Sequence, residues 1–203
     1  MRKTLFPVVL AVASAAVLGA CGSSDSPSGM PSHSPAPAPA PAPAPASGPQ
    51  DGHNADDVMF AQQMIAHHGQ ALDMAKLVPS RSTDPKVADL AARIEKAQDP
   101  EIRQMRAWLA TWGAGSATDM PGMTHGAMPG MMPADEMSKL EAAKGTEFDR
   151  RWLDMMIRHH QGAVDMAETE LSRGGNAEAK ALARKIIDAQ QAEITEMRGV
   201  RQR

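Results

Sequence analysis

The twelve residues MIAHHGQALDMA at positions 64–75 return as MIRHHQGAVDMA at positions 156–167. Both copies fit the pattern M-I-x-H-H-x-x-A-x-D-M-A, and the offset from residue 64 to residue 156 is 92. The same offset, without a gap, pairs Leu90 with Leu182, Ile94 with Ile186, Gln98 with Gln190, Glu101 with Glu193 and Met105 with Met197. A repeat of this length indicates one duplicated supersecondary unit, and neither copy is expected to bury its apolar face alone.

Apolar residues recur at spacings of three and four along each copy and along the segment that follows it, which is the pattern of amphipathic helices. No stretch carries a strand signal. We therefore predict an all-α fold, two tandem helical hairpins related by a pseudo-two-fold axis and packed as a four-helix bundle. The expected inner faces are Phe60, Met64, His67, Ala71 and Met74; Val87, Leu90, Ile94, Gln98, Glu101, Met105 and Trp108; Trp152, Met156, His159, Ala163 and Met166; and Leu182, Ile186, Gln190, Glu193 and Met197.

Cap and breaker residues predict where the helices begin and end. The expected boundaries are a start at residues 54–57 and an end at Pro79; a start at Asp84-Pro85 and an end at Gly113; a short lead-in helix from Asp135 to about Ala143; an end at Gly174-Gly175; and a cap at Asn176. Pro100 lies inside the second helix and is expected to kink it, whereas the second copy has Ala192 at that position.

The N-terminal part reads as an export signal and a spacer. A basic start is followed by an apolar run over residues 5–18, and Leu18-Gly19-Ala20-Cys21 resembles a bacterial lipobox, which makes Cys21 the expected lipidated residue and membrane anchor. An ordinary cleaved signal is the alternative. Residues 22–53 are rich in Ser, Gly and Pro-Ala repeats and are expected to form a disordered, extended linker. The folded domain is then 54–203, with repeat one at 54–112, a Met-rich connection at 113–134 and repeat two at 135–203.

Composition restricts the function classes. A net charge of −3 does not indicate a nucleic-acid-binding protein, which would carry an excess of basic residues. Because Cys21 is the only cysteine and is expected to be lipidated, the domain has no thiolate ligand, so that any soft metal ligand must come from the sixteen methionines. No serine or cysteine nucleophile arrangement and no Gly-rich phosphate loop is visible.

The paired histidines are the candidate metal ligands. At 100° per residue, His67 lies in the middle of the apolar face of its helix, and His159 has the same place in the second copy. His68 and His160 are rotated by one residue from these positions, so they are expected either inside the bundle or at its surface. Met64, Met156, Glu101 and Glu193 are expected on the inner faces of the bundle as well, and they are the further candidate residues of this metal site. The simpler interpretation is that each histidine bonds a glutamate and packs, but burying four imidazoles without a ligand is costly. Asp73 and Asp165 fall on the far side of their helices and are expected at the surface.

The duplicated motif, the lipoprotein-like start and the Met/Gly-rich connection together resemble the domain of unknown function 305 family, small secreted bacterial proteins of the ferritin-like superfamily. The resemblance covers residues 55–203. It implies a ferritin-like four-helix fold of two repeats and copper binding, and it supplies no established reaction.

The connection adds a second group of metal candidates: Met120, Met123, His125, Met128, Met131 and Met132. Thioethers select Cu(I), whereas imidazoles suit Cu(II) and other divalent transition metals. Drift in linker composition is the alternative reading of these methionines. Two glutamates are too few for a carboxylate-rich di-iron site, whereas a structural zinc site remains an alternative.

The predicted function is that of an extracytoplasmic, membrane-anchored lipoprotein for copper buffering, delivery or tolerance. The alternatives are a small metal-dependent oxidoreductase using the same site and a surface interaction module without metal.

Overall fold

The computed structural model describes residues 52–115 and 128–202, and within these ranges the chain forms five helices and no strand. The helices are α1 (Ala55–Arg81), α2 (Pro85–Thr111), α3 (Ala134–Ala142), α4 (Gly145–Arg173) and α5 (Ala177–Arg201). The all-α prediction is confirmed. The predictions for the signal, Cys21 and most of the linker, and those for Met120, Met123 and His125, lie outside the described residues.

Local capping explains the helix starts. The Asn54 side chain accepts hydrogen bonds from the Asp56 and Asp57 backbone N–H groups, and the Asp57 carboxylate accepts one from the Asn54 N–H at 2.6 Å, which completes a capping box. Asp84 caps α2 with proline in the first turn, and Asn176 caps α5 through the N–H groups of the next turn, both as predicted. These side chains satisfy N–H groups that have no partner inside the helix.

Two details of the predicted helices are wrong. Pro79 does not end α1, which continues to Arg81, because a proline in the last turn forfeits only its own N–H bond and the Ser82 N–H still reaches the Val78 carbonyl. Trp108 is half-exposed instead of buried, and it stacks on Trp112 at the end of α2 with ring centroids 5.8 Å apart. Gly113 does close α2, with the left-handed φ of +66° that favours glycine.

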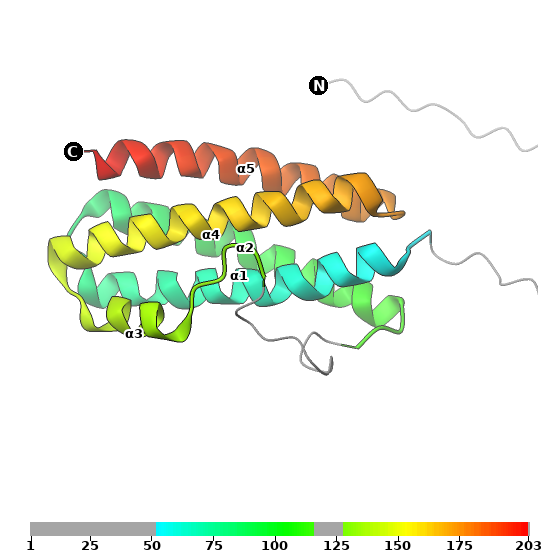
Figure 1. The fold of residues 1–203 in the computed structure, drawn as a ribbon, viewed down its shortest axis with the longest axis horizontal. Helices are drawn as coiled ribbons and strands as arrows, with labels where there is room; N and C mark the ends of the chain where they lie inside the picture. Colours follow the sequence, from blue (N-terminus) through cyan, green and yellow to red (C-terminus); the bar gives the residue numbers. More distant parts are fainter. Residues whose placement is uncertain (1–51, 116–127, 203) are drawn as a thin grey trace, which may run out of the picture. The chain divides into compact units, whose positions relative to one another are not determined.

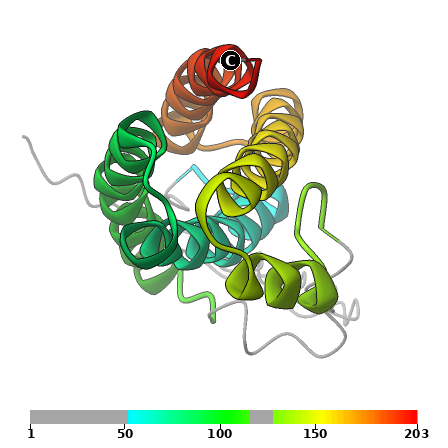
Figure 2. The same cartoon turned by 90° about the vertical axis from the view of Figure 1, so that its left-hand side faces the viewer.

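The four long helices form a bundle of two hairpins (Figures 1 and 2). Helix α1 packs along α2 and α4 packs along α5, while α1 against α4 is the main contact between the hairpins and α2 against α5 is the smaller one. Helix α3 lies outside this ring and packs on α4. The duplicated motifs on α1 and α4 therefore face each other across the centre of the domain.

The apolar core is divided into two clusters. One contains Ala71, Met74, Leu90, Ile94, Phe148, Trp152, Met156, Ile194 and Met197, and the other contains Phe60, Met64, Met105, Ala163, Met166, Leu182 and Ile186. On every long helix the two clusters are separated along the chain by buried or partly buried polar residues, which are His67 and His68, Gln98 and Glu101, His159 and His160, and Gln190 and Glu193. We call these eight residues the polar layer. Its position in mid-bundle means that the core is interrupted at the level of the duplicated histidines.

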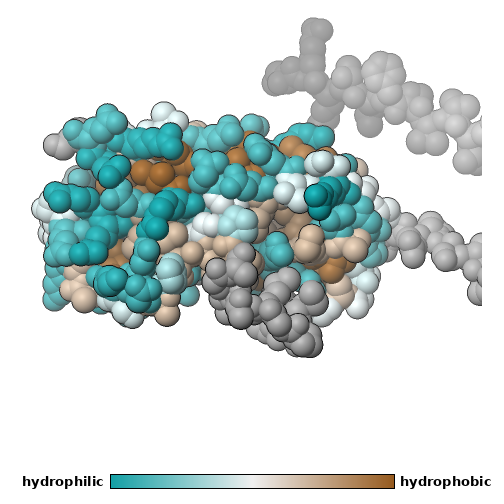
Figure 3. Space-filling model, viewed as in Figure 1, coloured by the Kyte–Doolittle hydropathy of each residue, from teal (hydrophilic) through white to brown (hydrophobic). Residues whose placement is uncertain are grey.

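The outer surface is mainly polar. Charged and polar side chains cover most of the face in Figure 3, with apolar residues in smaller patches between them. Among the described residues Met59 is the large apolar side chain that is exposed. No helix in this part of the chain is both long enough and apolar enough to span a bilayer.

Candidate metal centre

His67 and His159 meet at the centre of the polar layer. Their ring centroids are 3.7 Å apart with 34° between the ring planes, and neither residue is exposed. His67 Nε2 lies 3.1 Å from the Pro129 carbonyl oxygen. Because a carbonyl only accepts, Nε2 must carry the ring proton, which leaves Nδ1 as an unprotonated nitrogen with a free lone pair. Two neutral imidazoles from opposite repeats thus lie against each other.

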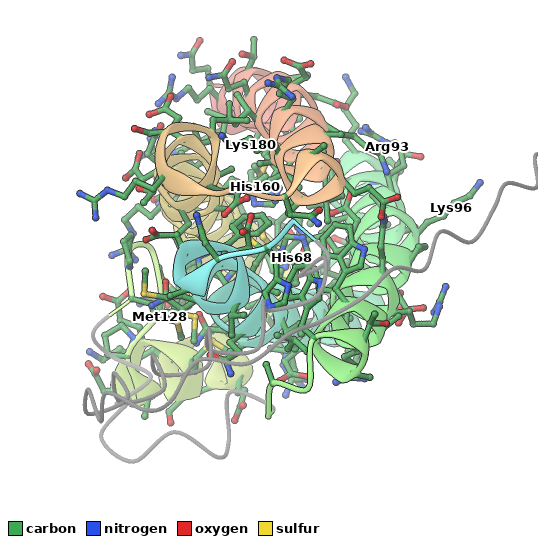
Figure 4. The ribbon with its side chains drawn as sticks, turned by 90° about the vertical axis from the view of Figure 1, so that its right-hand side faces the viewer. His68, Arg93, Lys96, Met128, His160 and Lys180 are labelled. Atoms are coloured by element: carbon green, nitrogen blue, oxygen red, sulfur yellow. The ribbon has the colours of Figure 1, made fainter. Side chains whose placement is uncertain are left out.

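His68 and His160 each form a couple with a glutamate from the partner helix of their own hairpin. His68 Nε2 is 2.9 Å from Glu101 Oε2, and His160 Nε2 is 2.8 Å from Glu193 Oε2. Both histidines are completely buried, which resolves the orientation that the sequence left open. Figure 4 shows their side chains inside the ring of helices. Each Nε2–H points at a carboxylate, so Nδ1 is again the nitrogen that has a free lone pair.

Glu101 stays ionised in this setting. Burial by itself would raise the pKa of Glu101, but the hydrogen bond from His68 and the ammonium of Lys185, 3.3 Å from Oε1, outweigh it and the net pKa is lowered. Lys185 belongs to α5, so Glu101 also connects the two hairpins. An ionised carboxylate behind an imidazole fixes the ring orientation and makes the far nitrogen a stronger ligand.

Three histidines of the layer, His67, His159 and His160, are held neutral. Burial, followed by the proximity of His68, lowers the pKa of His67 from 6.5 to about 3. Burial and the neighbouring histidines place the pKa of His159 well below its ordinary value, and burial lowers that of His160 even though Glu193 opposes the shift. Neutral imidazole is the form that binds a metal, and these rings therefore need not lose a proton first.

Several buried polar atoms of the layer have no hydrogen-bond partner among the described residues. They are Nδ1 of His67, His68 and His160, both ring nitrogens of His159, both amide atoms of Gln98, and Oε1 of Gln190. Each buried polar atom without a partner costs about 1–3 kcal/mol, and native interiors hold few of them. Their concentration at one level indicates a site that a ligand would complete.

These atoms suit a transition metal that takes neutral nitrogen donors. Fully buried Met64 and Met156 lie one helical turn before the histidines and add thioethers, which favour copper. Within residues 52–115 and 128–202, however, no three side chains of His, Cys, Asp or Glu are gathered as a ready-made metal cage. The donor set fits copper, but its free ring nitrogens are not gathered around one point in the described residues.

The other predicted site residues divide into surface and core. Asp73 and Asp165 are exposed, as expected, with Asp73 paired to Lys76 and Asp165 accepting from Gln161. Of the connection methionines within the described ranges, Met128 and Met131 are half-exposed. Met132, by contrast, is 6% exposed and packs in an apolar cluster. The reason is that its backbone is held against α1.

The end of the connection forms a contact that the sequence did not predict. Residues 128–132, here called the strap, cross α1 beside α4 before the chain enters α3 (Figure 1). Gln70 holds the strap at Met132 by two hydrogen bonds to its backbone, and Gly162 lies directly beneath Pro129 and Gly130. The available signal was the inverted order of two residues, Gly69-Gln70 in the first motif and Gln161-Gly162 in the second.

A second missed cluster lies at the end of the bundle where α1 begins. The buried carboxylate of Asp57 accepts N–H bonds from Asn54, Gly175 and Asn176, and buried Glu170 lies beside it. Burial and the Asp57 charge raise the pKa of Glu170 to about 8. The cluster contains no histidine and no sulfur, and it joins the start of α1 to the α4–α5 turn.

Comparison with known proteins gives one family match and several similar structures. The family described as "Domain of unknown function (DUF305)" matches residues 57–201. A curated relative, the uncharacterized protein L153 of Acanthamoeba polyphaga mimivirus, is 37% identical over 54 residues, and this match spans 27% of the chain and 36% of the relative.

Among solved structures, a DUF305 fragment from Deinococcus radiodurans is 38% identical with a TM-score of 0.65, and the match covers 73% of this chain and 96% of the other. A DUF305 protein from Streptomyces coelicolor is 35% identical with the same TM-score, at 70% and 89% coverage. CopM in its Cu(II)-bound form is 32% identical with a TM-score of 0.62, at 72% and 95% coverage. CopM has also been solved in a Cu(I)-bound form.

Proposed function

The chain belongs to the DUF305 family, and from that premise we propose that it binds copper outside the cytoplasm and serves to buffer, deliver or detoxify it. The observation that carries the proposal is the group of buried imidazoles whose free ring nitrogens occupy equivalent places in both repeats. The copper-bound forms of CopM, a similar structure, support the choice of metal. Export and anchoring at Cys21 rest on the sequence signal.

In this proposal His67 and His159 hold the ion with Met64 or Met156, and His68 and His160 take part through Nδ1. Bound copper would supply a centre whose Cu(I) form prefers thioether ligands and whose Cu(II) form accepts imidazole. The chain supplies neutral donors, a glutamate behind each of two rings, and an apolar cluster on either side that excludes water. Half-exposed Met128 and Met131 offer thioethers for Cu(I) nearer the surface.

Burial of the whole layer favours holding an ion over transforming a substrate. All four imidazoles are at 0% exposure, so an organic molecule has no contact with the ring nitrogens in this conformation. A metal-dependent oxidoreductase needs a coordination position open to its substrate. Copper storage or transfer requires only that the ion can enter and leave.

The test uses two sets of variants in a background where the connection methionines (Met120, Met123, Met128, Met131 and Met132) are changed to leucine. In that background His67→Ala with His159→Ala should remove the remaining copper, as measured by competition with a Cu(I) and a Cu(II) chelator. The matched control is His53→Ala, because His53 stacks on Trp112 far from the layer in sequence and is outside both motifs. Circular dichroism should show an intact helical signal in both.

Full copper stoichiometry in the double histidine variant would overturn the core site. In the parent, leucine substitution alone should lower Cu(I) binding more than Cu(II) binding. Equal loss of both ions would contradict the division between the connection methionines and the core histidines. Cell fractionation of a Cys21→Ala variant tests the anchor, since the protein should leave the membrane fraction.

A further inference from the structure

One position of the duplicated motif carries different residues in the two repeats, and both of them contact the strap. It is Gln70 in the first repeat and Gly162 in the second. The neighbouring position is inverted, with Gly69 and Gln161. At equivalent positions of the two helices that the strap crosses, α1 therefore has a side-chain amide and α4 has a glycine without a side chain.

Gly162 lets the strap lie directly on α4. A Cβ atom at this position would stand 2.1 Å from the Pro129 oxygen and 2.6 Å from Gly130 Cα. Gly130 has a left-handed φ of +76°, and a Cβ there would stand 2.8 Å from the Arg158 carbonyl oxygen and 2.9 Å from that of His159. Because all these neighbours are backbone atoms, which cannot rotate away, the contact requires glycine on both sides.

Gln70 holds the other end of the strap. Its Oε1 accepts the Met132 N–H at 2.7 Å, and its Nε2 donates to the Met132 carbonyl at 2.9 Å. The amide thus satisfies both backbone groups of one residue in a segment that has no helix or strand partner of its own. A Met131 N–H bond to the Met128 carbonyl closes the turn between the two attachment points.

The docked strap places the Pro129 carbonyl on the His67 ring. Pro129 itself is exposed, whereas His67 is fully buried, so a single layer of chain separates this imidazole from solvent. We propose that Gln70 and Gly162 are positioning residues that dock the strap as a lid over the His67–His159 pair. The docked lid fixes the Nε2–H of His67 on Pro129 and leaves Nδ1 for a metal ion, and lifting it is the step that admits or releases the ion.

The first experiment uses metal-free protein and does not depend on the proposed copper function. Diethyl pyrocarbonate modifies neutral imidazoles, and peptide mass spectrometry reports the rate at each histidine. Gln70→Ala removes two hydrogen bonds to the strap, and Gly162→Ala places a Cβ against the Pro129 backbone. Each should raise the rate at His67 and His159 about tenfold, because local opening of the docked strap is then opposed less strongly. The rates at His68 and His160, which their glutamates hold on the other side, should stay within about twofold.

The chain offers matched controls for both variants. Gly69→Ala changes the adjacent helical glycine, where a Cβ would meet nothing within 4 Å, and Gln161→Ala removes the other, exposed glutamine. Neither should alter the rate at His67 or His159. Unchanged rates in the Gly162 and Gln70 variants, or an equal rise at all four histidines in both, would overturn the lid.

The second experiment rests on the proposed function. Transfer of bound copper to an external chelator should be about tenfold faster in Gln70→Ala, while the equilibrium affinity changes by less than about threefold, because a lid acts on entry and exit alike. An affinity loss with an unchanged transfer rate would contradict it. If copper does not bind at all while the modification rates respond as described, the lid stands and the proposed function fails.

Discussion

The two repeats agree where they meet each other and differ where they meet the rest of the chain. His67 and His159, and the His–Glu couples formed with Glu101 and Glu193, occupy equivalent places within the bundle. At the surface of the same helices, Gln70 and Gly162 are not equivalent, because a single strap crosses both. A duplicated unit can keep a symmetric interior only if its edges diverge to accommodate the one connection that joins the copies.

The two ends of the bundle show the same divergence. At one end Asp57 faces Glu170 and the α4–α5 turn, and the equivalent positions at the other end are Asp149 and Val78. Asp149 is partly buried and accepts no hydrogen bond at Oδ1 among the described residues, while Val78 is an ordinary core residue. A polar attachment at one end is therefore matched by apolar packing at the other.

The largest effect should come from breaking that polar attachment. Asp57→Asn weakens bonds to three backbone N–H groups, and hydrogen bonds to a charged group contribute about 1.5–3 kcal/mol each, so we expect a loss of about 3 kcal/mol in the free energy of unfolding. Asp149→Asn, at the equivalent site, should cost less than about 1 kcal/mol. Urea unfolding of the two variants measures the difference. Equal losses would mean that the two ends are energetically equivalent after all.

Next in size is the effect of the glutamates behind the imidazoles. Glu101→Gln and Glu193→Gln should each weaken copper affinity about 10–100-fold, because an amide is a poorer acceptor for the Nε2–H and lowers the basicity of the ring. Chelator competition measures the affinity. Complete loss in either variant would instead make that carboxylate a direct ligand. Lys185→Met removes the ammonium beside Glu101. It should leave the His160–Glu193 couple unaffected, and it therefore tests whether the two repeats contribute independently.

The smallest effect concerns pH. The folded-state pKa of Glu170 is raised to about 8, so the folded protein retains a proton that the unfolded chain has lost above about 4.5. The stability contributed by this proton is complete below about 4.5 and is lost as the pH rises to about 8. Glu170→Gln should remove the slope across this window and raise the melting temperature at pH 8.5 by a few degrees, with little change at pH 5.

The control for this substitution is Glu168→Gln, an exposed glutamate on the same helix. It should leave the pH profile of the melting temperature as it is in the parent. Parallel profiles of the parent and Glu170→Gln between pH 5 and pH 8 would show that Glu170 ionises normally.

The sequence predicted the helices and the buried histidines because both are encoded locally. Spacings of three and four place Met64, His67 and Ala71 on one face, and short-range caps such as Asn176 mark the ends. The helix end predicted at Pro79 was wrong because a proline in the last turn of a helix interrupts few hydrogen bonds. Placing His68 inside the bundle required knowing how α1 is rotated against α2, because this rotation brings its ring to Glu101.

Long-range contacts were beyond local patterns. The strap has no hydrophobic period, and its attachment depends on Gly162 and Gln70. These two residues belong to different hairpins and contact different ends of the strap. Asp57 was recognised as a favourable residue for a helix start, but its partners in the α4–α5 turn are distant in the chain. In both cases a polar group is satisfied by backbone that the sequence does not identify in advance.

The attachment at the start of α1 also determines how the domain responds to force. The Asn54 side chain donates to the Arg173 carbonyl at 2.9 Å, next to the bonds that Asp57 makes with Gly175 and Asn176. A pull on the chain that precedes Asn54 is consequently shared between the first helix and the far end of the fourth. Several short bonds, loaded together, must give way before α1 can be peeled from its neighbours, so tension reaches the bundle as a whole before it disturbs the histidines.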